Sequence, residues 1–154
     1  MKSDYVKTSI SKDGIERILQ KTKDSANISM MFNPYGGKMS EILESEISFP
    51  RRAGNIYKIQ YLLYWNEMGA VSDNINLDSM REFYSYMTPF VSKNPREAFL
   101  NYRDIDNGMN DYNDGKVYGV KYFKNNFDRL VKVKTEFDPV AELYVDLGGE
   151  PPHP

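Results

Sequence analysis

Lys58 and Gln60 are the two polar side chains of this sequence that are best placed to do chemistry. They lie in an otherwise apolar stretch, residues 55–66, whose composition predicts a β-strand. Successive side chains of a strand point to opposite faces, which places Lys58 and Gln60 together. The same face carries Ile56, Leu62 and Tyr64, and the opposite, packing face carries Tyr57, Ile59, Tyr61, Leu63 and Trp65. Because an ammonium or amide is costly to bury without partners, the Lys58 face should be either solvent-exposed or a built site.

Other kinds of catalytic chemistry lack their residues in this chain. There is no cysteine, so it offers no disulfide, thiol nucleophile or thiolate metal site. The single histidine, His153, lies in a proline-rich tail, which disfavours serine–histidine–aspartate hydrolysis and histidine-bound zinc. Residues 104–108 begin like a calcium loop, but Gly108 and Met109 stand where a ligand and a turn glycine are needed. We expect no metal, and proton transfer must use tyrosine, lysine or carboxylate groups.

The composition, 40% hydrophobic and 27% charged over 154 residues, is ordinary for one soluble domain with a modest core. A net charge of −2 gives no reason to expect nucleic acid or a membrane surface as a partner. No apolar run reaches membrane-spanning length, and the first twenty residues lack the apolar core of a signal peptide. The 12 tyrosines suit half-buried strands or a pocket for a planar ligand.

Helical and extended patterns alternate along the chain. The expected elements are a helix over 12–23 capped by Ser11, a strand over 28–33 that ends at Pro34, a loop over 40–54, the strand over 55–66, a helix over 77–87 stopped by Pro89, a strand over 98–104, a polar loop over 106–115 and a last helix over 117–135. In a regular strand over 98–104, Tyr102 faces away from Asn101 and Arg103. Arg103 and Asp104 are expected to form structural hydrogen bonds.

A longer motif connects the chain to a known family. Residues 94–104, Asn-Pro-Arg-Glu-Ala-Phe-Leu-Asn-Tyr-Arg-Asp, with residues 89–93 before them, strongly resemble the berberine bridge enzyme-like family of plant FAD-linked oxidases. The likeness continues in the opening strand and in residues 34–37, 49–54, 121–131 and 138–139, and so covers about residues 1–139.

The resemblance implies an α+β fold in which an antiparallel sheet is backed by helices. Residues 1–116 would form part of the substrate-binding domain, residues 117–139 a C-terminal helix that returns to the flavin domain, and residues 140–154 a divergent tail. The chain is thus expected to be the C-terminal third of a secreted enzyme of the extracellular space or cell wall. Its expected partners are a small-molecule substrate and the missing N-terminal flavin domain.

The resemblance also implies roles for the polar residues. Tyr102 would lie beside the flavin as a catalytic base, with Asn101 and Tyr102 contacting the cofactor. Lys58 and Gln60 resemble the arrangement in members that oxidise allylic alcohols such as monolignols, whereas some other members carry glutamate at the position of Lys58. An ammonium close to a phenol stabilises the phenolate, so Lys58 would help Tyr102 to take the hydroxyl proton while Gln60 orients the substrate.

Two hypotheses remain open at this stage. In the first, the chain is part of a FAD-dependent oxidase of an alcohol, either monolignol-like or a sugar. In the second, it is a non-catalytic truncated product, or a binding domain with an aromatic pocket and no flavin; Lys58 is then solvated and Tyr102 is a core aromatic. The family attaches FAD through a histidine and a cysteine in motifs that are absent here, and it usually carries histidine where this chain has Arg51. The isolated chain is therefore expected to be colourless and inactive, and to fold poorly.

Overall fold

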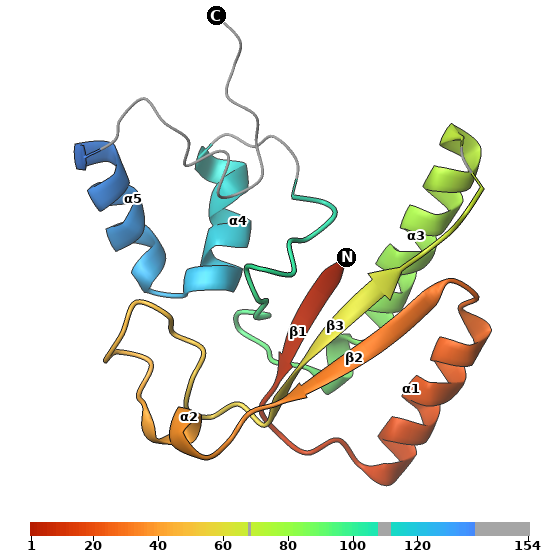
Figure 1. Ribbon diagram of the computed structural model, residues 1–154, viewed down its shortest axis with the longest axis horizontal. Helices are drawn as coiled ribbons and strands as arrows, with labels where there is room; N and C mark the ends of the chain where they lie inside the picture. The colour runs from red at the N-terminus through yellow and green to blue at the C-terminus, as the bar shows by residue number, and fades with distance from the viewer. Residues whose placement is uncertain (68, 108–111, 138–154) are drawn as a thin grey trace, which may run out of the picture.

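The computed structural model describes residues 1–67, 69–107 and 112–137 (Figure 1). It has the predicted α+β architecture, built on a three-stranded antiparallel sheet in the order β1-β3-β2. The strands are β1 (Lys2–Val6), β2 (Ile28–Pro34) and β3 (Tyr57–Leu63). The helices are α1 (Lys12–Asp24), α2 (Lys38–Glu41), α3 (Ala70–Tyr86), the 3-10 helix η1 (Thr88–Phe90), α4 (Tyr112–Phe123) and α5 (Asn126–Phe137). Among the described residues, none of these helices is both long and apolar enough to cross a bilayer.

One face of the sheet carries the core, and α1 and α3 cover it (Figure 1). Ile59 and Tyr61 of the central strand β3 are fully buried there, as their place on the predicted packing face requires. Helix α1 begins where the sequence predicts, because the Ser11 side chain accepts a hydrogen bond from the backbone N–H of Gly14 at 3.1 Å. The core consists of Val6, Ile18, Ile28, Ile59, Tyr61, Met80, Phe83, Tyr84, Met87 and Val91.

Buried charges join β1 to the segment that follows η1. Asp4 is fully buried and binds Arg96 through two hydrogen bonds, at 2.7 Å from Nε and 2.6 Å from Nη2. The Tyr61 hydroxyl donates a third bond to Asp4, at 2.9 Å. The ammonium of Lys2 lies 2.5 Å from Asp104 and 2.7 Å from Asp106. Residues 92–107 are thus held against β1 by ion pairs and by single hydrogen bonds, such as that from the Ser92 N–H to the Tyr5 carbonyl, without a paired strand.

The strand predicted over 98–104 is wrong, because this segment forms turns and irregular backbone. Its backbone N–H groups find other partners: that of Ala98 donates to the Lys121 carbonyl, that of Phe99 to the Ser3 hydroxyl and that of Tyr102 to the Phe99 carbonyl. The segment lies beside the edge strand β1, but it contacts β1 through single hydrogen bonds, such as that of Phe99 to Ser3, and forms no strand pairing with it. Tyr102 is therefore positioned by a turn and not by a regular strand.

The single helix predicted over 117–135 is also wrong. The structure has two helices, α4 and α5, separated at Lys124, whose backbone adopts the left-handed conformation with φ 51°. The assumed domain boundary at 116/117 lies inside α4, which also takes up part of the predicted loop over 106–115. Residues 138–154, including the divergent tail, lie outside the described residues. Helix α3 starts at Ala70, seven residues before the predicted start, and β3 is shorter than predicted.

Replacing Gly119 of α4 by alanine is expected to destabilise the packing of α4 on α5. An added Cβ would lie 2.1 Å from Cε2 of Phe127, whose side chain is only 1% exposed. Such overpacking costs about 1–3 kcal/mol, which exceeds the roughly 1 kcal/mol that alanine gains in helix propensity.

Urea unfolding of the protein measures the effect of Gly119→Ala. The control is Gly36→Ala, where an added Cβ meets nothing within 4 Å. A free energy of unfolding for Gly119→Ala equal to or above that of the unmodified protein would contradict the prediction.

Candidate active site

The polar face of β3 is the one that α1 and α3 leave uncovered. The strand register gives its members: Lys58 opposite Asn33 and Tyr5, and Gln60 opposite Met31 and Ser3. The segment 97–102 lies beside this face, where the N–H of Phe99 donates to Ser3 at 2.9 Å. Lys58 is half-buried and Gln60 is only 8% exposed, with its amide 3.3 Å from the Met1 sulfur. The polar face is therefore partly enclosed by protein.

The ammonium of Lys58 lies against two aromatic rings that contact each other edge-on. Its Nζ is 3.5 Å from the centroid of the Phe99 ring and 4.6 Å from that of Tyr102. Cations bind the negative faces of aromatic rings, so the two rings hold this charge in place. No described residue forms an ion pair or a hydrogen bond with Lys58, so its N–H groups remain available to a ligand. Burial lowers the pKa of Lys58.

Tyr102 lies next to Lys58, and its hydroxyl points toward β2. It donates a hydrogen bond to Oδ1 of Asn33 at 3.2 Å, and its ring meets the Phe99 ring edge-on at 5.1 Å between centroids. The structure thus brings Lys58 and Tyr102 together, as the resemblance implies. The positive charge faces the ring of Tyr102, where it can still stabilise a phenolate.

Two residues of this cluster were missed from the sequence, Asn33 and Phe99. Asn33 is separated from Tyr102 by 69 positions in the chain, so no local spacing could pair them. The one sequence feature that could have drawn attention to Asn33 was its position as the last residue before Pro34 in a predicted strand. Phe99 sits three residues before Tyr102, and its role depends on the turn that was mistaken for a strand.

The neighbours of Tyr102 divide into exposed and buried groups. Asn101, expected to contact the cofactor, is exposed at the turn. Arg103 is exposed and forms no hydrogen bond or ion pair with a described residue, so the structural role expected of it stays a prediction. Asp104 does have a structural role, since it is 5% exposed and accepts a hydrogen bond from Lys2.

Arg51 is fully buried, with its guanidinium 5.6 Å from the centroid of the Tyr5 ring. Its Nη1 lies 3.0 Å from Glu97 Oε1, and its Nη2 donates to the carbonyl of Lys121. Two more cations, Lys7 and Lys124, lie 2.7 Å and 3.1 Å from the same carboxylate oxygen. This cluster fixes the chain two residues before Phe99, and so anchors the turn that carries Phe99 and Tyr102.

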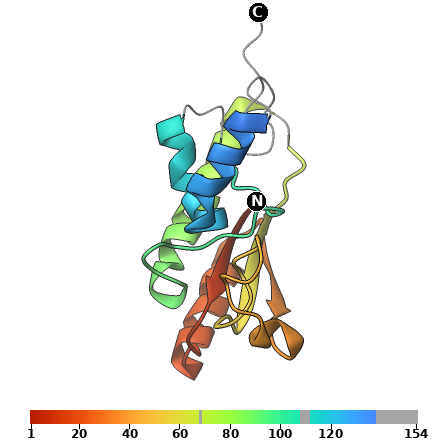
Figure 2. The same cartoon turned by 90° about the vertical axis from the view of Figure 1, so that its left-hand side faces the viewer.

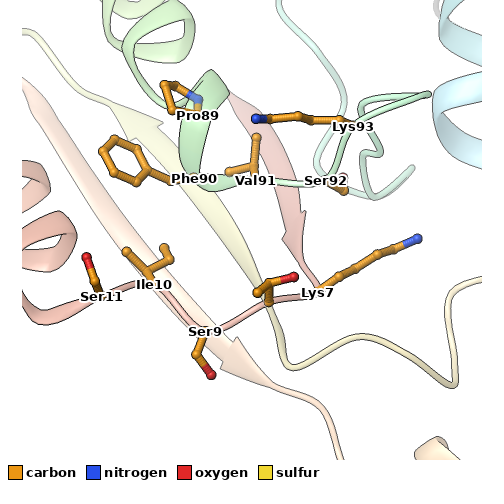
Figure 3. Close-up of a pocket in the computed structure, with 10 residues that line it drawn as sticks. Lys7, Ser9, Ile10, Ser11, Pro89, Phe90, Val91, Ser92 and Lys93 are labelled. Atoms are coloured by element: carbon orange, nitrogen blue, oxygen red, sulfur yellow. The ribbon is translucent and has the colours of Figure 1, made fainter.

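A cavity of about 560 Å³ lies away from these residues, between the β1–α1 connection and η1 (Figure 3). It is lined by residues 7–11 and 89–93 and includes neither Lys58 nor Tyr102. Lys7 points away from Phe90 within it (Figure 3), toward its ion pair with Glu97. In the part of the chain that the structure describes, no group of three or more histidine or acidic side chains is arranged to hold a metal.

The Lys58 ammonium is expected to titrate below the ordinary lysine pKa of about 10.4, because burial disfavours its charged form. NMR of the protein with ¹³C-methylated lysines measures this pKa directly. The Lys58→Met variant identifies the resonance by its loss. A Lys58 resonance that titrates at or above the ordinary value would contradict the enclosed position of this side chain.

Comparison with known proteins finds similarity to berberine bridge enzyme-like proteins. The family model described as "Berberine and berberine like" matches residues 98–141. The Arabidopsis thaliana protein "Berberine bridge enzyme-like 14" is 56% identical over 141 residues, which cover 90% of this chain and 27% of that protein. The "Tetrahydroberberine oxidase" of Berberis wilsoniae is 45% identical, over 99% of this chain and 29% of that protein. The crystal structure of Phl p 4, "a grass pollen allergen with glucose dehydrogenase activity", superposes with a TM-score of 0.78 at 44% identity, over 90% of this chain and 29% of that one.

Over most of its length, the chain is therefore similar to members of the berberine bridge enzyme-like family, which are oxidoreductases. It spans less than a third of the length of these relatives.

The residues present fit one side of a flavin site and no more. Tyr102 and Phe99 offer aromatic surface, and Lys58 and Gln60 offer hydrogen-bond donors on the same uncovered face. By contrast, the chain has no cysteine, and Gly36-Gly37 lies between β2 and the short helix α2 without the spacing of a phosphate-binding loop. Phe99, Tyr102, Lys58 and Gln60 would thus suit contact with a flavin ring and its substrate, whereas the described residues offer no phosphate-binding loop for the nucleotide.

Proposed function

We propose that this chain forms the substrate-side wall of an FAD-dependent oxidoreductase that oxidises an alcohol to an aldehyde or ketone. The observation that carries the proposal is the position of the half-buried Lys58 ammonium, which lies against the Phe99 and Tyr102 rings with no anionic partner in the described chain. The rings fix the position of the charge but leave its N–H groups free to donate to a bound molecule. We also propose that the protein is secreted and that a flavin domain completes the site.

The chemistry follows from what each side chain can donate or accept. Tyr102 accepts the proton of the substrate hydroxyl in its phenolate form, which the adjacent Lys58 ammonium stabilises, and becomes a neutral phenol in the transfer. The Asn33 amide holds the Tyr102 oxygen and can turn its NH₂ toward a phenolate. Gln60, on the same face as Lys58, is placed to hydrogen-bond the substrate oxygen. Bound FAD supplies the acceptor for the hydride that leaves the carbinol carbon.

Aromatic allylic alcohols are the substrate class that we favour. The described face offers aromatic surface from Phe49, Phe99 and Tyr102, with ring centroids 5.9 Å and 5.1 Å apart along this series. The polar side chains on it, Lys58, Gln60 and Asn33, include no carboxylate. Such a surface suits a planar apolar substrate with one hydroxyl better than a sugar with several. A sugar remains the second candidate, because a 44% identical structure is described as having glucose dehydrogenase activity.

Anaerobic mixing of the intact flavoprotein with each substrate class tests the proposal. We expect an aromatic allylic alcohol to bleach the visible absorbance of the flavin, and glucose to do so more slowly or not at all. Faster bleaching by glucose would replace the allylic alcohol by a sugar as the substrate. No bleaching by any alcohol or sugar would favour the non-catalytic alternative.

The chain produced by itself is expected to be colourless, because it carries neither attachment residue for FAD. Its absorbance spectrum after purification measures this. A yellow preparation with a flavin spectrum would show that the chain holds FAD in a way that its residues do not indicate.

A further inference from the structure

A glycosylation sequon stands at the turn between α1 and β2. The tripeptide Asn27-Ile28-Ser29 is the one place in the sequence where asparagine is followed two residues later by serine or threonine with no proline between. A tripeptide of this kind is frequent by chance, so its value depends on where the fold places the acceptor.

The fold leaves the acceptor accessible. Asn27 and Ser29 are both exposed, whereas Ile28 between them is 6% exposed and belongs to the core. Asn27 follows the end of α1 at Asp24 and directly precedes β2, so its side chain lies at a surface turn. Chain turns of this kind are where a bulky, solvated group is tolerated.

The hydrogen bonds of Asn27 are compatible with a sugar on its amide. Nδ2 donates one hydrogen to Oδ1 of Asn76 at 2.6 Å. A side-chain amide carries two hydrogens, so one is left for replacement by a glycan. The backbone carbonyl of Asn27 is already bound by the N–H of Tyr64 at 3.1 Å, which fixes the turn independently of the side chain.

An exposed aromatic ring lies beside the acceptor. Tyr64 is 67% exposed, and its backbone hydrogen bond to Asn27 makes the two residues neighbours. A tyrosine ring offers an apolar face with a polar edge, which suits the apolar face of a sugar ring. The first sugar would thus cover a ring that is otherwise open to solvent.

We infer that Asn27 is an N-glycosylation site of this protein. Nδ2 of Asn27 attacks the anomeric carbon of an oligosaccharide carried on a lipid diphosphate. A C–N bond forms, the bond from the anomeric carbon to the diphosphate oxygen breaks, the amide loses one proton, and the lipid diphosphate leaves. The inference requires passage through the secretory pathway, as proposed above, and is independent of the flavin chemistry.

The test is expression of the protein behind a cleavable secretion leader in plant or insect cells. A reporter sequon appended after Pro154 receives a glycan in every molecule that enters the secretory lumen, so only molecules with that glycan are counted. We expect two glycans on the unmodified chain, and peptide N-glycosidase should remove both. This enzyme converts the glycosylated Asn27 to aspartate, and peptide mass spectrometry detects that change.

Two substitutions separate the acceptor from the fold. Ser29→Ala removes the hydroxyl that the transfer requires but keeps Asn27 and its bond to Asn76, and it should leave the reporter glycan alone. Ser29→Thr keeps the sequon and should carry two glycans. A reporter glycan alone on the unmodified chain, or two glycans on Ser29→Ala, would overturn the inference, whichever alcohol the enzyme oxidises.

Discussion

Replacing Tyr102 by phenylalanine is expected to slow reduction of the flavin by the alcohol about 10²–10⁴-fold, the usual contribution of a positioned acid or base. The variant keeps the ring that meets Phe99 and Lys58, and it loses only the hydroxyl that donates to Asn33. Rapid anaerobic mixing of the intact flavoprotein with substrate measures this rate. Tyr64→Phe, at a tyrosine that is 67% exposed, is the matched control and should reduce at the unmodified rate.

The Lys58→Met variant distinguishes proton transfer from packing. Without the ammonium, no positive charge faces the Tyr102 ring to stabilise its phenolate form, so we expect flavin reduction to be slower although the Tyr102 hydroxyl is intact. Rates that stay unchanged in both variants would contradict the roles given to these residues.

Replacing Arg96 by methionine is expected to lower the free energy of unfolding by about 3–5 kcal/mol. The change leaves the fully buried carboxylate of Asp4 without its two charge-assisted hydrogen bonds, and an unpaired buried charge is strongly destabilising. Arg96 also donates to the Tyr84 carbonyl and lies 3.4 Å from the centre of the Tyr84 ring, so further contacts are lost. Urea unfolding of the protein followed by circular dichroism measures the difference.

Arg81→Met is the control for this result. Arg81 also binds two carboxylates, those of Asp78 and Asp106, but its side chain is 49% exposed, so its removal should cost at most about 1 kcal/mol. Equal losses of unfolding free energy in Arg96→Met and Arg81→Met would show that burial does not determine how much the Asp4–Arg96 pair contributes to stability.

The parts of the fold that could be predicted from sequence are those that depend on local pattern. Strand β3 was predicted because its alternation matches two faces, one buried at Ile59 and Tyr61 and one carrying Lys58 and Gln60. Helix α1 was predicted from its apolar spacing and from Ser11, which caps it as expected. Both signals arise within a few residues of the position that they determine.

The parts that could not be predicted depend on contacts between distant segments. Residues 98–104 were predicted to be a strand, but the Ser3 hydroxyl and the Lys121 carbonyl accept hydrogen bonds from the backbone N–H groups of Phe99 and Ala98. The break at Lys124 needs a left-handed residue other than glycine, which the sequence does not announce. The placing of Tyr102 near Lys58 came from the family motif, and its bond to Asn33 appears only in three dimensions.

The antiparallel register of β3 couples correct folding to the completeness of the polar face. Lys58 faces Asn33 because the two strands pair at that register, and a slip of one residue would turn Lys58 toward α1 and α3 and turn Ile59 outward. Such a molecule would lose its core as well as its polar face, so it would not persist as a folded species. The register that buries the core therefore also sets the position of Lys58. A preparation of the protein should contain correctly folded molecules and unfolded molecules, with no folded population in which β3 is shifted.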